Sequence, residues 1–314
     1  MTDFTWRRLF RSRSFRNRSV KNRPQTAALG MVVAVAGLAV FAPTLAAQSS
    51  DTAGAEDVVR LISSRRAEAS ETPIRASVRY GAGSLFISPG RPGQLYTLDL
   101  AYDAEAFRPV ESFTNGRLEL GVESARESRR FNLDTDADWQ MRVELGTGIA
   151  YLLDVEFGAG EARIDLGGLQ LADLTLSAGA SKTRLDVSKA NPQILPHAEL
   201  EIGASEFTAR GLGNLRVQRL EAAVGVGEVT LSFDGAGVES GAVEIQLGLG
   251  DLTIEVPEEI GIRVDKDSFL ASFDAPGLEE RGGRWYSSNW DSAEQRLTFE
   301  IDTAFGSIRF VRLP

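Results

Sequence analysis

The chain has no cysteine among its 314 residues, and it has a single histidine. No disulfide can stabilise it, no lipid can be attached through a cysteine, and metal sites of the His/Cys type are excluded. A histidine-based nucleophile or base would have to be His197, which lies between Pro196 and Ala198 with no serine or aspartate motif around it. The composition therefore predicts a protein that is not an enzyme and that uses no cofactor.

Positive charge is concentrated at the start of the chain. Residues 1–46 contain eight bases and one acid, and an apolar stretch without charge runs from Thr26 to Ala46. The small residues Thr44, Ala46 and Ala47 fit a signal-peptidase site, so this segment predicts a secretory signal peptide. The stretch also has the roughly 20 residues that span a bilayer, so a retained membrane anchor stays open. Either alternative predicts export to the periplasm or cell envelope, with membrane contact only if the segment is retained.

The rest of the chain is acidic. The whole chain has a net charge of −10, and the first 46 residues contribute +7, which leaves −17 for the remainder. Such a surface disfavours nucleic acid and anionic lipid as partners. Residues 47–73 resemble a linker, in which Val58, Val59, Leu61 and Ile62 suggest a short helix over residues 57–68.

A glycine-punctuated repeat dominates the sequence after residue 150. In residues 153–166, apolar and charged residues alternate on both sides of Gly158-Ala159-Gly160, which predicts two half-buried strands joined by a glycine corner. The first glycines of five such units lie at 158, 179, 203, 225 and 248, with spacings of 21, 24, 22 and 23 residues. This period predicts an all-β, single-stranded parallel β-helix, a solenoid with coils of 21–24 residues. An antiparallel meander with glycine turns is the alternative, but it needs no common period.

Two regions depart from the repeat. Residues 74–150 contain an early unit around Gly81-Ala82-Gly83 and several alternating runs, which predict a small β-rich N-terminal domain or wider first coils. Residues 151–314 then form the solenoid, and the break at residues 265–296 before a last strand predicts a cap at its C-terminal end.

Most candidate chemistry is weak. Asp134, Asp136 and Asp138 have the spacing of half a calcium loop, but Trp139 and Leu145 stand where the loop needs glycine and glutamate. A non-standard calcium site there stays open. The Gly-x-Gly units precede strands rather than helices, which argues against phosphate binding. The outward carboxylates are spread over the coils, which favours a solvated face over a carbohydrate-cleaving groove.

The most unusual stretch runs from Arg281 to Trp290. It interleaves aromatic rings with arginine and asparagine, and it predicts either a plug for the solenoid end or a site that binds a sugar or protein partner. The candidate binding residues are Arg284, Trp285, Tyr286, Asn289 and Trp290.

The repeat resembles the toast-rack and LiaF-like proteins of the bacterial cell envelope. The matching units are residues 155–168, 247–257 and 285–308, with residues 74–150 similar to the toast-rack N-terminal domain. The resemblance implies a single-strand β-helix without a catalytic signature, and LiaF-like members regulate envelope-stress signalling. We therefore expect an exported binding or scaffold module whose partner is an envelope protein or a glycan. A carbohydrate-active or carbohydrate-binding β-helix and an adhesin-like surface protein are the alternatives.

Overall fold

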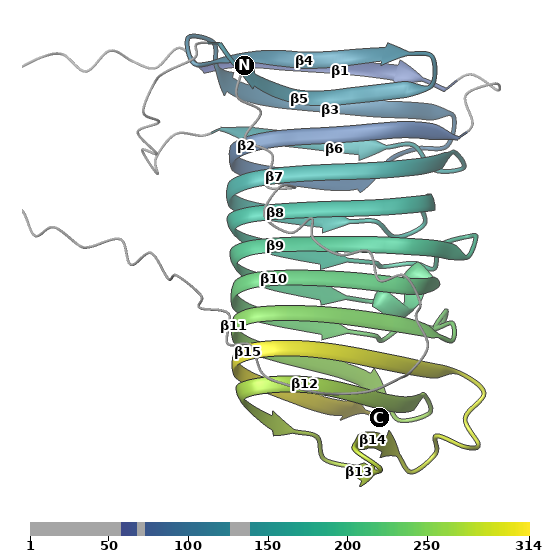
Figure 1. Cartoon of the computed structure of the whole chain (residues 1–314). Coiled ribbons are helices and arrows are strands. Elements are labelled where there is room, and N and C mark those ends of the chain that lie inside the picture. The colour runs from purple at the N-terminus through teal and green to yellow at the C-terminus, as the bar shows by residue number, and fades with distance from the viewer. Residues whose placement is uncertain (1–57, 68–72, 126–138) are drawn as a thin grey trace, which may run out of the picture. The chain divides into compact units, whose positions relative to one another are not determined.

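The computed structural model describes residues 58–67, 73–125 and 139–314, and residues 54–314 belong to one compact unit. The predicted signal segment and the candidate calcium residues Asp134, Asp136 and Asp138 lie outside the described residues. The described part is almost entirely β, and its strands form one sheet in the order β1-β3-β6-β2-β7-β8-β9-β10-β11-β15-β12-β14-β13, with β5 beside β2 and β4 beside β5 (Figure 1).

Long bent strands make up the stack of coils. Figure 1 shows each of them wrapping around the molecule and lying parallel to its neighbours. They are β2 (Ile74–Pro89), β7 (Ala150–Asp165), β8 (Gln170–Asp186), β9 (Leu195–Arg210), β10 (Val217–Ser232), β11 (Gly241–Pro257), β12 (Gly261–Asp274) and β15 (Arg296–Leu313). A short 3-10 helix, η2 (Leu212–Leu215), precedes β10. The predicted parallel β-helix is confirmed.

The register of the strands confirms the repeat length. Val155 pairs with Leu176, Leu176 with Leu200, and Leu200 with Ala222, so equivalent residues follow one another at the expected 21–24 residue period. Alternate residues of each strand point inward, and the inward ones are buried in one hydrophobic core that runs through the stack. Stacking is what buries this face, because a single coil has no second layer against which to pack.

The glycine corners are required by close backbone stacking. Gly250 has φ +141°, and a Cβ added there would lie 1.8 Å from the carbonyl oxygen of Gly227 in the preceding coil. Both the backbone conformation and the space therefore exclude a side chain. Two coils carry serine at the same position, and the hydroxyl of Ser205 donates a hydrogen bond to the carbonyl oxygen of Ser181.

The N-terminal end combines parallel and antiparallel pairing. β2 pairs in parallel with β7 on one side, and on the other side with β5 (Arg117–Ser124) and β6 (Gln140–Leu145), which divide its length between them. β3 (Gln94–Asp103) and β4 (Phe107–Thr114) are antiparallel to β6 and β5. The buried hydroxyl of Tyr151 in β7 lies 3.1 Å from the carbonyl oxygens of both Leu95 and Gly146, which joins this region to the repeat.

The helix predicted over residues 57–68 is wrong. Strand β1 (Val58–Arg66) occupies this stretch and pairs antiparallel with β3. Burial alternates along it with a period of two, and β-branched residues such as Val58 and Ile62 suit a strand better than a helix. The apolar cluster in the sequence was too short to distinguish the period of a helix, about 3.6 residues, from the period of two of a strand.

The C-terminal strand does not end the stack. β15 lies between β11 and β12, parallel to both, so that Ile245 pairs with Ile301 and Lys266 pairs with the same Ile301 from the other side. Residues 265–274, expected to interrupt the repeat, instead continue the last coil as part of β12. The end of the stack is completed by β13 (Leu278–Arg281) and β14 (Arg284–Ser287), which lie beyond β12 in Figure 1.

Candidate binding surfaces

The five candidate binding residues lie together at the C-terminal end of the stack. β14 pairs antiparallel with β12 through Tyr286 with Arg263 and Trp285 with Val264. Trp285 packs against Phe273 at 5.0 Å between ring centroids. Phe273 in turn contacts Phe310, and both rings adjoin the hydrophobic core. The indole of Trp285 therefore closes the last coil of the core.

Asn289 holds the turn that connects β11 to β12. Its side-chain amide donates hydrogen bonds to the carbonyl oxygens of Glu258 and Glu259, each at 3.0 Å. Its own oxygen accepts a hydrogen bond from the hydroxyl of Ser287 at 2.7 Å. Arg312 of β15 donates to the carbonyl oxygen of Glu258 as well. The turn is thus fixed by both the cap and the last strand.

Contacts within the protein also surround the other three residues. The ring of Trp290 has the guanidinium groups of Arg263 and Arg296 at 5.8 Å, and Tyr286 meets it edge-on at 5.8 Å. Arg284 donates to a carboxylate oxygen of Asp265 at 3.0 Å. These contacts indicate that residues 281–290 cap the end of the stack. Ligand binding there stays a prediction.

Carboxylates form a ladder on the outer face before the glycine corner. In-register pairing places Glu199 beside Glu221, Glu221 beside Glu244, Glu244 beside Glu300, and Glu300 beside Asp265. We call these five residues the acid ladder. From the sequence the outward carboxylates were interpreted as spread over the coils. The insertion before β15 hides the alignment of Glu300 with the other members of the ladder.

Electrostatics along this face are only partly balanced. Arg219 contacts Glu221 and Glu244 at 2.7 and 2.6 Å. Burial raises the pKa of Glu244 above its usual value, and the negative charges of Glu221 and Glu300 raise it further. Beside the ladder, burial and then the charges of Asp267 and Asp265 likewise raise the pKa of Asp302. Like charges therefore accumulate toward the C-terminal end of the stack.

An apolar ridge runs along the glycine corner itself. The middle residue of each Gly-x-Gly unit points outward, and it is alanine in the first coils but large and apolar in the last ones. Val226 pairs with Leu249, Leu249 with Phe305, and Phe305 with Leu270, while Phe269 stacks edge-on against Phe305 at 6.1 Å. These five side chains, which we call the corner ridge, are 42% to 77% exposed.

The sequence contained the signal for the corner ridge. The residues between the glycines change from Ala159 and Ala180 to Val226 and Leu249 along the chain. This trend becomes visible only when the units are aligned by coil and each middle residue is assigned to the outside. Exposed apolar side chains that adjoin one another are typical of interaction sites, whereas scattered ones are not.

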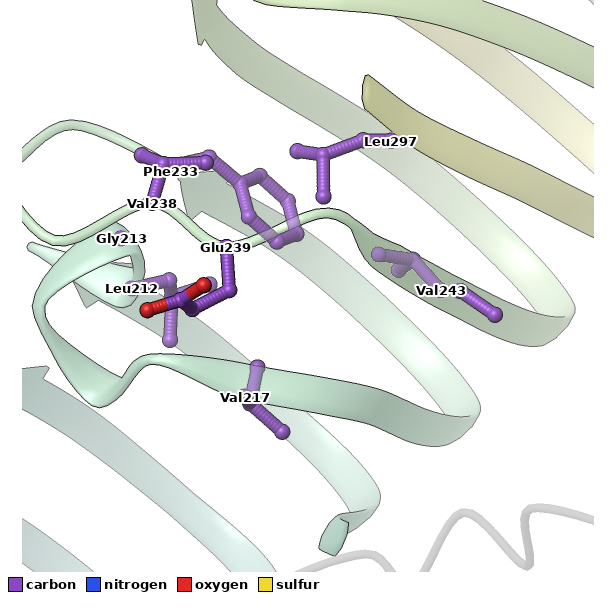
Figure 2. Close-up of a pocket in the computed structure, with 9 residues that line it drawn as sticks. Leu212, Gly213, Val217, Phe233, Val238, Glu239, Val243 and Leu297 are labelled. Carbon is purple, nitrogen blue, oxygen red and sulfur yellow. The ribbon is translucent and has the colours of Figure 1, made fainter. Parts of the chain in front are cut away.

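One of the cavities among the described residues is very small. Figure 2 shows an apolar pocket beside η2, where Leu212, Val217, Phe233 and Glu239 surround a space of about 10 Å³. This volume admits no more than a water molecule. A second depression of about 240 Å³ lies on the face after the corner and is lined by bases and carboxylates, among them Lys182, whose ammonium lies 2.9 Å from Glu206.

The remaining candidates gain no support from the geometry. His197 is half-exposed on β9, with its ring nitrogens 3.6 Å from Asp173 and from Glu221. In residues 58–67, 73–125 and 139–314, no group of three or more His, Cys, Asp or Glu residues has the arrangement of a metal site. The same ranges contain no helix with the length and apolarity that a membrane span requires.

The sequence of residues 56–208 matches the family model for the N-terminal domain of toast_rack, DUF2154. These residues belong to the toast-rack family. The resemblance seen in the sequence is therefore confirmed for the toast-rack domain, which spans strands β1 to β8 and most of β9. None of the curated proteins matches the chain.

Solved structures to which the chain is similar include candidate adhesion proteins. A candidate cell adhesion protein from Clostridium sporogenes is 17% identical, with a TM-score of 0.42, and the match covers 82% of this chain and 100% of that one. A candidate adhesin from Bacteroides fragilis is 11% identical, with a TM-score of 0.38, and the match covers 82% and 98% of the two chains.

Proposed function

We propose that this toast-rack protein is an exported, non-enzymatic module of the cell envelope that binds another envelope macromolecule through its corner ridge. The observation that supports the proposal is the run of large, exposed apolar side chains on an otherwise acidic molecule. Soluble proteins seldom leave such side chains adjacent to one another on the surface unless a partner covers them. The LiaF-like resemblance extends the proposal to a part in envelope-stress sensing.

A carbohydrate-cleaving function has less support. Such chemistry needs two carboxyl groups at a defined separation on either side of a bound sugar. The acid ladder lies instead on the outer face of parallel strands, where neighbours are roughly 4.8 Å apart. The two cavities described above do not include any of its members. A binding module therefore accounts for the surface better than a glycosidase does.

Site-specific cross-linking in intact cells tests the proposal. A photoreactive amino acid replaces Leu249 on the corner ridge, and in a control protein it replaces Thr253, which lies on the same strand but off the ridge. We expect a discrete adduct from position 249 that is absent from position 253 and is lost when Phe305→Ser is added. Equal labelling at the two positions, or no adduct at position 249, would contradict binding through the ridge.

A further inference from the structure

The open edge of β12 and the corner ridge form one continuous surface at the C-terminal end of the stack. We propose that this surface binds an extended, positively charged segment of another protein, which pairs with β12 as an additional strand. The inference rests on the proposed function and specifies its partner by conformation and charge.

The first argument is the unpaired backbone of β12. On one side β12 pairs with β15 from Gly261 to Asp274. On the other side, within the described residues, β14 pairs with it only at Arg263 and Val264. The peptide groups of residues 268–274 therefore present a free strand edge, and an extended segment can complete their hydrogen bonds by strand addition.

The second argument is the lack of edge protection in this segment. Exposed sheet edges in natural proteins usually carry charged residues that prevent pairing with other chains. Within the part of β12 that β14 leaves unpaired, the charged residues stand at the two ends, at 265–267 and at Asp274, and residues 268–273 between them have the uncharged sequence Ser-Phe-Leu-Ala-Ser-Phe. At the opposite end of the stack, the outer strand β1 carries Arg60, Arg65 and Arg66. The uncharged middle of the β12 edge therefore offers less resistance to pairing than β1 does.

The third argument is the position of the corner ridge relative to this edge. Phe269 and Leu270 belong to the free segment and are 77% and 62% exposed. Phe305 lies beside them on β15. Apolar side chains of an added strand would cover these groups, so the same partner would satisfy the backbone and bury the end of the ridge that lies nearest to β12. Removal of these exposed apolar groups from water favours association.

The fourth argument is charge, which selects a cationic partner. Carboxylates lie on both sides of the corner ridge: Asp267 and Asp302 precede the corner in neighbouring coils, and Asp251 and Glu228 follow it. Basic side chains on an added strand could reach Asp267 and Asp302, while Asp251 and Glu228 lie farther from the edge of β12 and attract a cation at longer range. Anionic lipid would be repelled by them, and a second copy of this chain would bring the same negative charges to the interface.

Peptide binding to the full chain tests the inference. The probe is a fluorescent ten-residue peptide that alternates lysine and valine, and its anisotropy is measured against increasing protein. We expect binding that weakens about tenfold between 50 and 300 mM salt, because screening shortens the range of the charges. A peptide with glutamate in place of lysine, and a lysine–valine peptide with alternate backbone nitrogens methylated, are expected not to bind.

Matched variants locate the site. We expect Leu270→Ser to weaken binding of the lysine–valine peptide at least fivefold and Asp267→Asn with Asp302→Asn to reduce its salt dependence. The control Ile62→Ser removes a side chain of similar exposure, 65%, from the opposite end of the stack and should change nothing. Each substituted side chain is exposed, so the variants should fold.

Several outcomes would overturn the inference. The glutamate peptide or the methylated peptide could bind as well as the parent peptide, which would exclude charge selection or strand pairing. Leu270→Ser and Ile62→Ser could weaken binding equally, which would place the peptide elsewhere. Sedimentation could show a dimer that Leu270→Ser dissociates, or phosphatidylglycerol vesicles could bind the chain through Leu270, which would identify a second copy or a membrane as the occupant. The adduct at Leu249 would support the proposed function in each of these cases.

Discussion

Replacement of Gly250 by alanine should destabilise the stack strongly. The φ of +141° costs an alanine about 1–3 kcal/mol of backbone strain. The added Cβ would lie 1.8 Å from the carbonyl oxygen of Gly227, so the coils must separate locally, at a further cost of about 1–3 kcal/mol. Together these effects should lower the free energy of unfolding by about 3–5 kcal/mol, which corresponds to a fall in melting temperature of roughly 10 °C.

Two matched variants separate the contributions in the same thermal denaturation experiment, followed by circular dichroism. Gly93→Ala changes a glycine at φ +77° with nothing within 4 Å of the new Cβ, so it carries the backbone strain alone. Gly81→Ala, whose Cβ also meets nothing within 4 Å and whose φ is not in the left-handed region, should melt like the parent protein. The reasoning is refuted if Gly250→Ala melts within 2 °C of Gly81→Ala, an interval of about 1 kcal/mol or less.

Three further changes test the core, the cap and the acidic face. Asn191→Ala should lower the free energy of unfolding by about 2 kcal/mol, because the buried side-chain amide accepts a hydrogen bond from the N–H of Leu171 and donates one to its carbonyl oxygen. Urea denaturation measures this loss, and an unchanged midpoint would show that the two hydrogen bonds do not stabilise the coil. Asn289→Ala should lower the free energy of unfolding by about 1 kcal/mol or more, because it removes hydrogen bonds to the backbone of the turn. Arg284→Ala should lower it by less than about 0.5 kcal/mol, because it removes only an exposed ion pair. Equal losses would argue against a role of Asn289 in holding the cap. Asp302→Asn should stabilise by about 0.5 kcal/mol at pH 7. Because folding raises the pKa of Asp302, the parent protein loses stability as the pH rises through that pKa. Below the unfolded pKa near 3.8 the carboxyl is protonated in both states, so the stability gained by Asp302→Asn should vanish there. A gain that persists at pH 3 would show that the charge of Asp302 is not its cause.

Local alternation and the glycine period were enough to predict the coils, because both follow from properties of single strands. The alternation puts Leu176, Leu200 and Ala222 on the same inner face, and the three residues pair in register as that pattern predicts. The strand at Val58–Arg66 was missed because its few apolar residues fit two periods. Its pairing with β3 decided the conformation, and long-range pairing cannot be deduced from one short segment.

The surfaces were harder to predict than the core for a related reason. The acid ladder and the corner ridge both depend on the order in which the coils are stacked. β15 contributes a residue to each of them, and its residues lie 56 positions after the β11 residues with which they pair. The stretch from Arg281 to Trp290 was recognised by its composition, but its contacts were not. A sequence motif shows which residues are unusual, whereas the register of the stack determines which residues are neighbours.

The interposed position of β15 leads to a last prediction, about removal of residues 296–314. β15 pairs with β11 from Gly241 to Pro257 and with β12 from Gly261 to Asp274, so it joins the last coil to the rest of the stack. Without it, β12 would keep only its short contact with β14 among the described strands. We therefore expect amide hydrogen exchange in residues 261–295 to accelerate by orders of magnitude, while residues 150–232 stay protected.

The same measurement distinguishes two consequences of the deletion. β11 and β12 both alternate buried and exposed residues, so β12 could dock directly on β11 in the truncated chain. Persistent slow exchange in residues 261–274 would show that docking, and it would contradict the view that β15 is required to hold the cap. Rapid exchange confined to residues 261–295 would instead show that the last strand of the chain is the link through which the end of the stack, with its corner ridge and open edge, is kept in place.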